Sequence, residues 1–249
     1  MYGFGPDQVL IIALAMALGG LVKGTIGIGL PVVCVAILSN FFPVTLVLGL
    51  VIVPIALTNL WQAVHAGNPM EPIRRFWPMI VCLLITIYLT AKLVVRIDEA
   101  LLYGLIGIAV MIFSATSLIR PSRGLSPATE RWAGPLAGTL GGILGGISTM
   151  WGPPMMMYFV MLGLPKEAFI RAVGLVWFAG SIPLVIGYIE NGILNGTTAQ
   201  ISALACLPGF LGLWLGTVLR RYIPQEIFRK VLLLALFVVG LNLIRRALV

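Results

Sequence analysis

The sequence predicts an all-α integral membrane protein built from two homologous halves. Of its 249 residues, 60% are hydrophobic and only 10% are charged, and the mean hydropathy is +1.08. A soluble domain carries about 25% charged residues, so this chain lacks the polar surface that such a domain needs. Apolar stretches of 18 or more residues recur along the whole chain, which is typical of membrane helices. Similar motifs also recur 122 to 126 residues apart, which predicts the two halves.

Eight apolar segments are separated by short polar or turn-forming connections. The longest polar run covers residues 120–131 and divides the chain nearly in half. We therefore expect one membrane domain made of an N-terminal transmembrane repeat, residues 1–125, and a C-terminal one, residues 126–249. The eight segments are residues 9–38, 43–64, 76–95, 101–119, 132–162, 169–189, 199–219 and 227–244.

The first and fifth segments are each interrupted by glycines followed by proline. In a helix interior Gly costs about 1 kcal/mol and Pro about 3 kcal/mol relative to Ala, so neither segment forms one regular helix. Irregular backbone inside a membrane is tolerated only where protein or water covers it. Because Pro is favoured at the first position of a helix, we expect a second half-helix to begin near Pro31 and another near Pro154. Repeats with broken helices are typical of secondary transporters.

These breaks are the candidate substrate site. The N-terminus of a half-helix presents free N–H groups and the positive end of the helix dipole, which suits an anion. Lys23 lies beside the first break, and a charge inside a membrane segment marks a functional site by default. Asn59 and Gln62 are three residues apart and so share one helix face. The predicted substrate-binding residues are Lys23, Gly24, Thr25, Gly27, Gly29, Pro31, Asn59, Gln62, Gly146, Ser148, Thr149, Trp151, Gly152, Pro153 and Pro154.

Each of these residues also has a purely structural interpretation. Glycines four residues apart favour close helix packing. Lys23 could instead extend toward the membrane surface, and Asn59 and Gln62 could form hydrogen bonds between helices. Both interpretations remain open at the level of the sequence.

Basic residues give a test of topology. If all eight segments crossed the membrane, Lys and Arg would divide almost evenly between the two sides and predict no orientation. If the two broken segments are re-entrant hairpins, six segments cross, the halves are inverted and both termini lie outside the cytoplasm. The cytoplasmic side then holds Arg74, Arg75, Arg120, Arg123, Arg131, Lys166, Arg171, Arg220, Arg221, Arg229 and Lys230, and the other side holds Lys92, Arg96, Arg245 and Arg246. This bias favours the inverted-hairpin arrangement.

The motifs resemble those of the TauE/SafE family of sulfite and organosulfonate exporters over essentially the full chain. The resemblance rests on the glycine-rich break that ends in Pro31, its copy that ends in Pro154, and the Ile97-Asp98-Glu99 boundary. It implies transport of a small sulfur-containing or carboxylate anion, driven by a proton or sodium gradient or by the membrane potential. The bulky Trp151 stands where the family has a glycine run, which implies an altered pocket.

We therefore expect a multi-pass protein of the inner (cytoplasmic) membrane that acts as a secondary transporter, exporting a small anion such as sulfite, an organosulfonate or a related carboxylate. Two alternatives are an anion channel, with the breaks as its filter, and a membrane assembly factor that moves no solute. The residue types predict no catalytic group, metal or other cofactor, and therefore no enzyme. The expected partners are the anion, lipid and a coupling ion, with no nucleic acid. Glycine-rich helix faces would permit a homodimer.

Overall fold

In a computed structural model, residues 5–65, 67–118, 125–220, 222 and 225–248 are described, and they form helices without strands. The eight predicted segments become ten α-helices because two of them break. The helices are α1 (Pro6–Ile26), α2 (Leu30–Leu38), α3 (Val44–His65), α4 (Met70–Ala91), α5 (Glu99–Leu118), α6 (Pro127–Ser148), α7 (Gly152–Met161), α8 (Lys166–Glu190), α9 (Gly196–Leu219) and α10 (Gln225–Ala247), with a 3-10 turn at Val94–Arg96.

Long apolar helices make this chain a multi-pass membrane protein. Within the described residues, five helices are long and apolar enough to cross a membrane, namely α1, α3, α4, α8 and α9. Large apolar side chains also cover the outside of the bundle, for example Leu14 on α1, Ile85 on α4 and Leu211 on α9, each more than half exposed. In water such a surface would be unfavourable, whereas lipid tails solvate it.

Glycines bring α1 against α9 and α4 against α6. A Cβ atom added to Gly20 would lie 2.0 Å from the carbonyl oxygen of Gly209, and one added to Gly24 would lie 2.2 Å from that of Leu213. The residue numbers of these contacts increase together along both helices, so α1 and α9 run parallel. Backbone contact this close is the use of small residues that membrane helices favour.

The α4–α6 pair repeats this arrangement. A Cβ atom on Gly142 would lie 1.7 Å from Thr86 Oγ1, and one on Gly146 would lie 1.9 Å from Thr90 Oγ1. These helices are again parallel. The glycines of the two broken segments therefore have a packing role in both pairs.

The other two main pairs are antiparallel. In α5 and α10, Gly104 lies against Ala247 and Gly107 against Ile244. In α3 and α8, Asn59 contacts Ser181 and Ala63 contacts Gly174, so the residue numbers run in opposite directions. The buried core is continuous between these pairs and the breaks.

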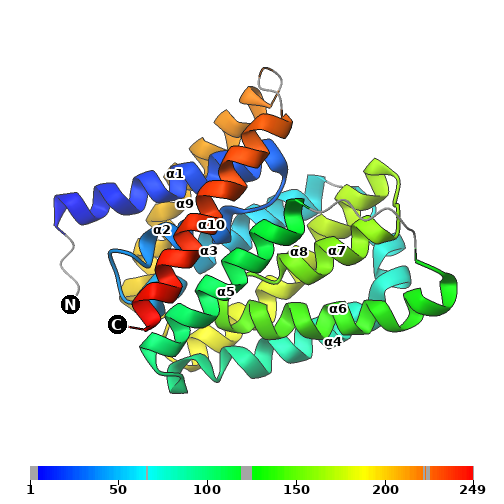
Figure 1. The fold of residues 1–249 in the computed structure, drawn as a ribbon, viewed down its shortest axis with the longest axis horizontal. Coiled ribbons are helices and arrows are strands. Elements are labelled where there is room, and N and C mark those ends of the chain that lie inside the picture. The colour runs from blue at the N-terminus through cyan, green and yellow to red at the C-terminus, as the bar shows by residue number, and fades with distance from the viewer. Residues whose placement is uncertain (1–4, 66, 119–124, 221, 223–224, 249) are drawn as a thin grey trace.

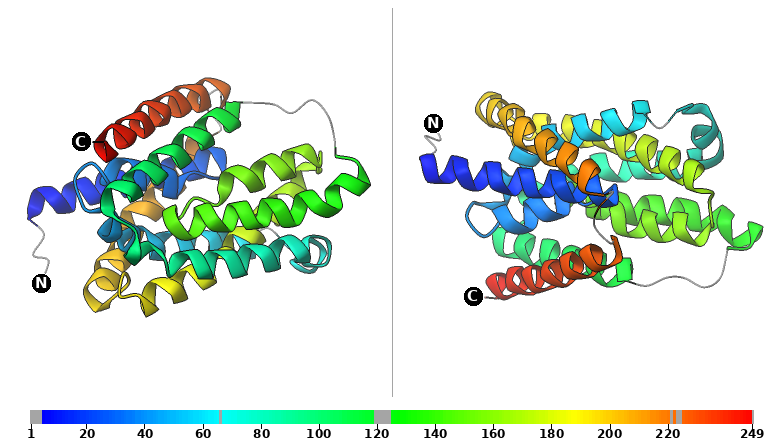
Figure 2. Two further views of the ribbon diagram at one scale, coloured as in Figure 1. Left: turned by 60° about the horizontal axis from the view of Figure 1, so that its bottom comes forward. Right: turned by 90° about the horizontal axis from the view of Figure 1, so that it is seen from above.

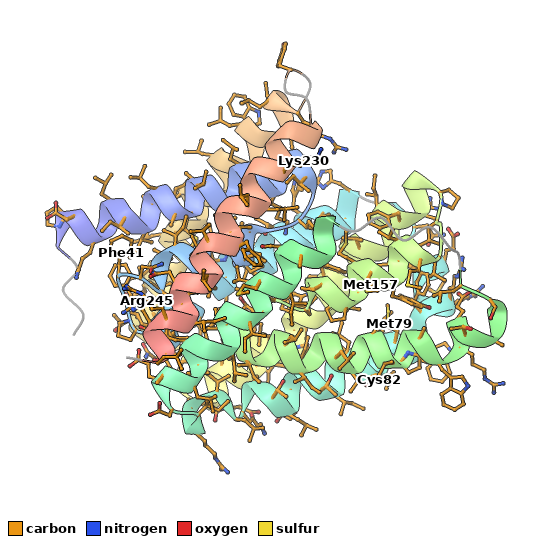
Figure 3. All side chains as sticks on the ribbon, in the orientation of Figure 1. Phe41, Met79, Cys82, Met157, Lys230 and Arg245 are labelled. Carbon is orange, nitrogen blue, oxygen red and sulfur yellow. The ribbon has the colours of Figure 1, made fainter. Side chains whose placement is uncertain are left out.

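Each broken segment folds back on itself. The Cys34 thiol in α2 lies 3.4 Å from the carbonyl oxygen of Ala15 in α1, and a Cβ atom on Gly19 would lie 3.1 Å from that of Leu30. Figure 1 shows the α1–α2 pair reaching the centre from the left and the α6–α7 pair reaching it from the right. The views in Figure 2 agree, and they show both chain termini at the same end of the molecule. Arg245 and the α2–α3 connection, marked by Phe41, also lie at that end (Figure 3).

Candidate functional site

The first break is made by two glycines in left-handed backbone conformations. Helix α1 ends at Ile26, and Gly27, with φ of 91°, closes it by donating its N–H to the carbonyl of Lys23 at 2.7 Å. Gly29, with φ of 109°, then caps α2, which has Pro31 in its first turn. Only glycine adopts such φ values without strain. The predicted start of a half-helix near Pro31 is confirmed, one residue earlier at Leu30.

The second break uses a different residue for the same purpose. Helix α6 ends at Ser148, and Thr149, with φ of 62°, donates its N–H to the carbonyl of Gly145 at 2.8 Å. Helix α7 begins at Gly152 rather than at the expected Pro154, because proline fits the first turn of a helix, where its missing N–H needs no partner. A half-helix is confirmed here as well, two residues earlier than expected.

The two breaks meet in one pocket. It is small, with a cavity volume of about 20 Å³, and partly open to solvent. Lys23 is the single charged side chain among the described residues that line it, and there is no carboxylate among them. No group of three or more potential metal ligands occurs within the described residues. The lining comprises Ile28, Gly29, Pro31 and Val32 from one hairpin, Thr149, Met150, Trp151 and Gly152 from the other, and Lys23, Asn59 and Trp177.

Lys23 is buried, with 5% of its surface exposed, and is held by two groups of α3. Its ammonium donates to Thr58 Oγ1 at 3.0 Å and to Asn59 Oδ1. The Thr58 hydroxyl donates in turn to the carbonyl of Pro54 at 2.6 Å, so the oxygen lone pairs face Lys23. None of the ion pairs formed between described residues includes Lys23. Because an ammonium carries three N–H groups, one remains for the pocket.

Asn59 is oriented by α8. Its Nδ2 donates to the carbonyl oxygen of Trp177 at 3.2 Å and to Ser181 Oγ at 3.0 Å. Both amide hydrogens are therefore used, and Oδ1 must face Lys23 as an acceptor. The two groups that hold the lysine are thus both acceptors.

Two polar side-chain atoms of the pocket have no partner within the described part of the chain. They are Thr149 Oγ1 and Trp151 Nε1, and both side chains are at least 99% buried. An unsatisfied buried donor costs about 1–3 kcal/mol. An indole N–H can only donate, so any partner of Trp151 Nε1 must be an acceptor.

Several predicted site residues lie outside the pocket lining. Gly24 and Gly146 pack against α9 and α4, in agreement with their structural interpretation. Gly27 forms the turn at the end of α1, and the rings of Pro153 and Pro154 begin α7.

The predicted hydroxyl donors differ from one another. Thr25 Oγ1 donates to the carbonyls of its own helix at 2.9 and 3.0 Å, and Ser148 Oγ donates to Leu144 at 2.6 Å. Only Thr149 has a free hydroxyl among the three. Gln62 is half-buried, and its Oε1 has no partner among the described residues, yet it does not line the pocket.

Sequence reasoning missed three residues that shape the site, namely Thr58, Trp177 and Ser181. Thr58 could have been noticed as a hydroxyl beside Asn59. Trp177 and Ser181 lie about 120 residues away, and the apolar pattern of their helix distinguishes neither of them. Their role follows from the crossing of α3 and α8.

The chain was compared with curated proteins, solved structures and protein families. The searches of curated proteins and of solved structures found no match. The sequence model of the family described as "Sulfite exporter TauE/SafE" matches residues 12–243, nearly the whole chain. This is a family of transporters. The match covers both breaks, all ten helices in whole or in part, and every residue of the pocket, and the chain belongs to the TauE/SafE family.

Proposed function

We propose that the protein is a secondary transporter that exports a small anion, such as sulfite or an organosulfonate, bound where the two breaks meet. One observation carries the proposal: both breaks line the same pocket as a buried lysine that has no acidic partner among the described residues. Family membership supports the substrate class.

The electrostatics of the pocket favour an anion. A buried ammonium without a counter-charge is costly, and two neutral oxygens compensate for it only in part. A bound anion would complete the pairing, and the positive N-terminus of α2 opens on the same pocket. This balance gives the substrate, rather than a protein carboxylate, the role of counter-charge.

The order of the helices supports an inverted repeat of residues 1–125 and 126–249. Helix ends at 26 and 148, and helix starts at 30 and 152 and at 44 and 166, are each 122 residues apart. In this repeat α1 is equivalent to α6, and α4 is equivalent to α9. The parallel α1–α9 pair therefore corresponds to the parallel α6–α4 pair. Helices α5 and α10 are equivalent and antiparallel. A two-fold axis relates two antiparallel helices only when the axis is perpendicular to them. The axis that relates α5 to α10 would therefore lie in the membrane plane.

This symmetry supports alternating access. Two hairpins that enter from opposite faces and meet at the pocket can expose it to one side at a time. With the basic residues near the starts of α4 and α8 (Arg74, Arg75, Lys166 and Arg171) facing the cytoplasm, both termini lie outside it in the inner membrane. Arg120, Arg123 and Arg221, which belong to the predicted cytoplasmic set, lie outside the described residues. A proton or sodium gradient or the membrane potential supplies the driving force.

Flux through purified protein in liposomes tests the proposal. Radiolabelled sulfite uptake should saturate with concentration and respond to an imposed ion gradient or membrane potential. Lys23→Met should reduce it at least tenfold, because it removes the only charge of the described pocket lining. The matched control is Lys92→Met: Lys92 pairs with Glu190 at 2.9 Å on an exposed surface, where a salt bridge contributes about 0–1 kcal/mol.

The possible results separate the alternatives. Non-saturable flux that follows only the gradient of the anion would identify a channel. Sulfite, organosulfonate and carboxylate flux no greater than in empty liposomes, with a folded protein, would overturn transport of these anions. Equal loss in both lysine variants would remove Lys23 from the site.

A further inference from the structure

The two halves of the pocket differ at the positions that matter most. At the spacing of 122 residues, Lys23 corresponds to Gly145 and Gly29 corresponds to Trp151. The first half therefore combines a lysine with a small residue at the break, and the second combines a small residue with a tryptophan. The position of the lysine in one half has no charge in the other.

The Trp151 ring fills the space that this exchange leaves. A Cβ atom added to Gly145 would lie 2.9 Å from both Cβ and Cε3 of Trp151. One added to Gly180 would lie 3.6 Å from Cε2 of the same ring. The indole is 1% exposed, so glycine at both positions makes room for it.

Gly180 is informative because it corresponds to Thr58. The two residues that hold the Lys23 ammonium, Thr58 and Asn59, correspond to Gly180 and Ser181. The second half thus lacks the cation together with one of its supports, and the other support is a serine that binds Asn59 instead. One cationic position exists in the described pocket, and a neutral indole N–H without a partner takes the place of a second.

From this asymmetry we propose that the pocket takes a compact oxyanion with a single charge, bridging the Lys23 ammonium on one hairpin and the Trp151 N–H on the other. The hydrogen sulfite anion and small alkanesulfonates belong to this class. The proposal rests on the proposed function and narrows its substrate. Trp151 becomes a residue that determines specificity.

The residues that line the pocket disfavour the two neighbouring classes. A dianion such as sulfoacetate would bury a second negative charge with no second cation among the described residues that line the pocket, at a cost in desolvation. A zwitterion such as taurine would bring an ammonium group into a pocket whose described lining residues include no carboxylate. The oxygens of a single sulfonate, by contrast, can accept from Lys23 and Trp151 at once.

Thermal stabilisation of the purified protein tests this choice. A ligand that binds the folded state raises the apparent unfolding temperature by mass action. Methanesulfonate carries one charge, sulfoacetate two, and taurine one of each sign. We expect methanesulfonate and sulfite, measured at mildly acidic pH, to bind at least tenfold more tightly than sulfoacetate or taurine.

The variant Trp151→Phe isolates the indole N–H. It keeps an aromatic ring and should raise the Kd for methanesulfonate about tenfold, because a hydrogen bond to a charged group is lost. The matched control is Trp214→Phe on α9, a residue that is 61% exposed and should leave the Kd unchanged.

Each outcome has a distinct meaning. Equal or tighter binding of sulfoacetate than of methanesulfonate would overturn the single-charge proposal while leaving anion transport intact. An unchanged Kd in a folded Trp151→Phe protein would overturn the bridging role. If none of these anions stabilises the wild-type protein, the proposed function itself fails. If Trp151→Phe does not fold, the preference of the wild-type protein between methanesulfonate and sulfoacetate still decides the charge class.

Discussion

Asn59 of α3 donates from Nδ2 to Ser181 Oγ of α8 at 3.0 Å, and the two residues are 122 positions apart in the chain. They occupy corresponding positions of the two proposed repeats, so the bond lies where the halves cross. It also turns Oδ1 of Asn59 toward Lys23. A contact between the halves therefore orients the group that holds the buried charge.

Replacing Asn59 by aspartate should block the site. The new carboxylate would pair with Lys23 and compete with the anion for its charge. We expect the Kd for sulfite to rise at least tenfold, equivalent to about 1.4 kcal/mol, as measured by ligand-induced thermal stabilisation. The control is Asn68→Asp, which keeps the exposed acceptor for the Met70 N–H and should bind like the wild type. An Asn59→Asp protein with wild-type affinity would exclude Lys23 as the anion's partner.

The contact between α1 and α9 predicts opposite outcomes for two glycines that touch. Gly20→Ala places a Cβ atom 2.0 Å from the carbonyl oxygen of Gly209, and we expect destabilisation by about 1–3 kcal/mol from overpacking. Gly209→Ala meets nothing within 4 Å and should be neutral or stabilising, by up to about 1 kcal/mol. Thermal unfolding in detergent compares the two. Equal melting temperatures would mean that α1 and α9 are less closely packed.

Left-handed backbone at the first break can be tested at Gly27, because a Cβ atom there would meet no other atom within 4 Å. Gly27→Ala should therefore report only the cost of a φ of 91°, about 1–2 kcal/mol, with reduced transport. Gly27→Asn should recover part of the loss, since asparagine tolerates this conformation better. Sulfite flux and melting temperature measure both effects. If alanine and asparagine behave alike, conformational strain is not the cause.

Ser202 of α9 compensates for the proline inside α3. Pro54 has no N–H for the carbonyl of Leu50, and Ser202 Oγ donates to that oxygen at 2.7 Å while accepting from the Val53 N–H at 3.2 Å. Ser202→Ala should cost about 1–3 kcal/mol, because a buried carbonyl loses its partner.

A double-mutant cycle with Pro54→Ala completes this test. Alanine at position 54 restores the helical N–H, so Ser202→Ala should lower the free energy of unfolding by less in that background. The coupling energy between Pro54 and Ser202 should therefore be favourable. Melting temperatures of the four proteins give the value. Additive effects would show that Ser202 does not serve the proline.

The proposed inverted arrangement of the two hairpins predicts the location of the chain ends. Reporter fusions at both termini should show activity outside the cytoplasm, and a fusion inserted at Gly163, between α7 and α8, should show activity inside. The physical reason is that the basic residues near the starts of α4 and α8 favour the cytoplasmic side. A cytoplasmic C-terminus would contradict the arrangement, whatever the result at Gly163.

Much of this fold was predictable from the sequence because its signals are local. Hydropathy over about 20 residues identifies membrane helices, and glycine or proline interrupts a helix wherever it occurs in the interior. The helices accordingly match the eight predicted segments, and the breaks fall at Gly27–Gly29 and Thr149–Trp151. Lys23 was prominent as an isolated charge, and the resemblance to the TauE/SafE family is confirmed.

What depended on the tertiary structure was the assignment of neighbouring residues to different roles. Ser148 is the last residue of α6 and bonds its own helix, whereas Thr149 leaves the helix in a left-handed conformation and lines the pocket without a partner among the described residues. Gly24 adjoins Lys23 but packs against α9. Local pattern cannot decide such cases, because they depend on which helix packs on each face.

The same reason applies to the composition of the site. Its lining joins residues about 120 positions apart, and Trp177 comes from a helix that crosses α3 through contacts invisible in either segment alone. The sequence by itself determined that this is a helical membrane protein with two broken segments and an isolated lysine in the first of them. Only packing decided that both breaks share one pocket and that Lys23 and Trp151 line it together.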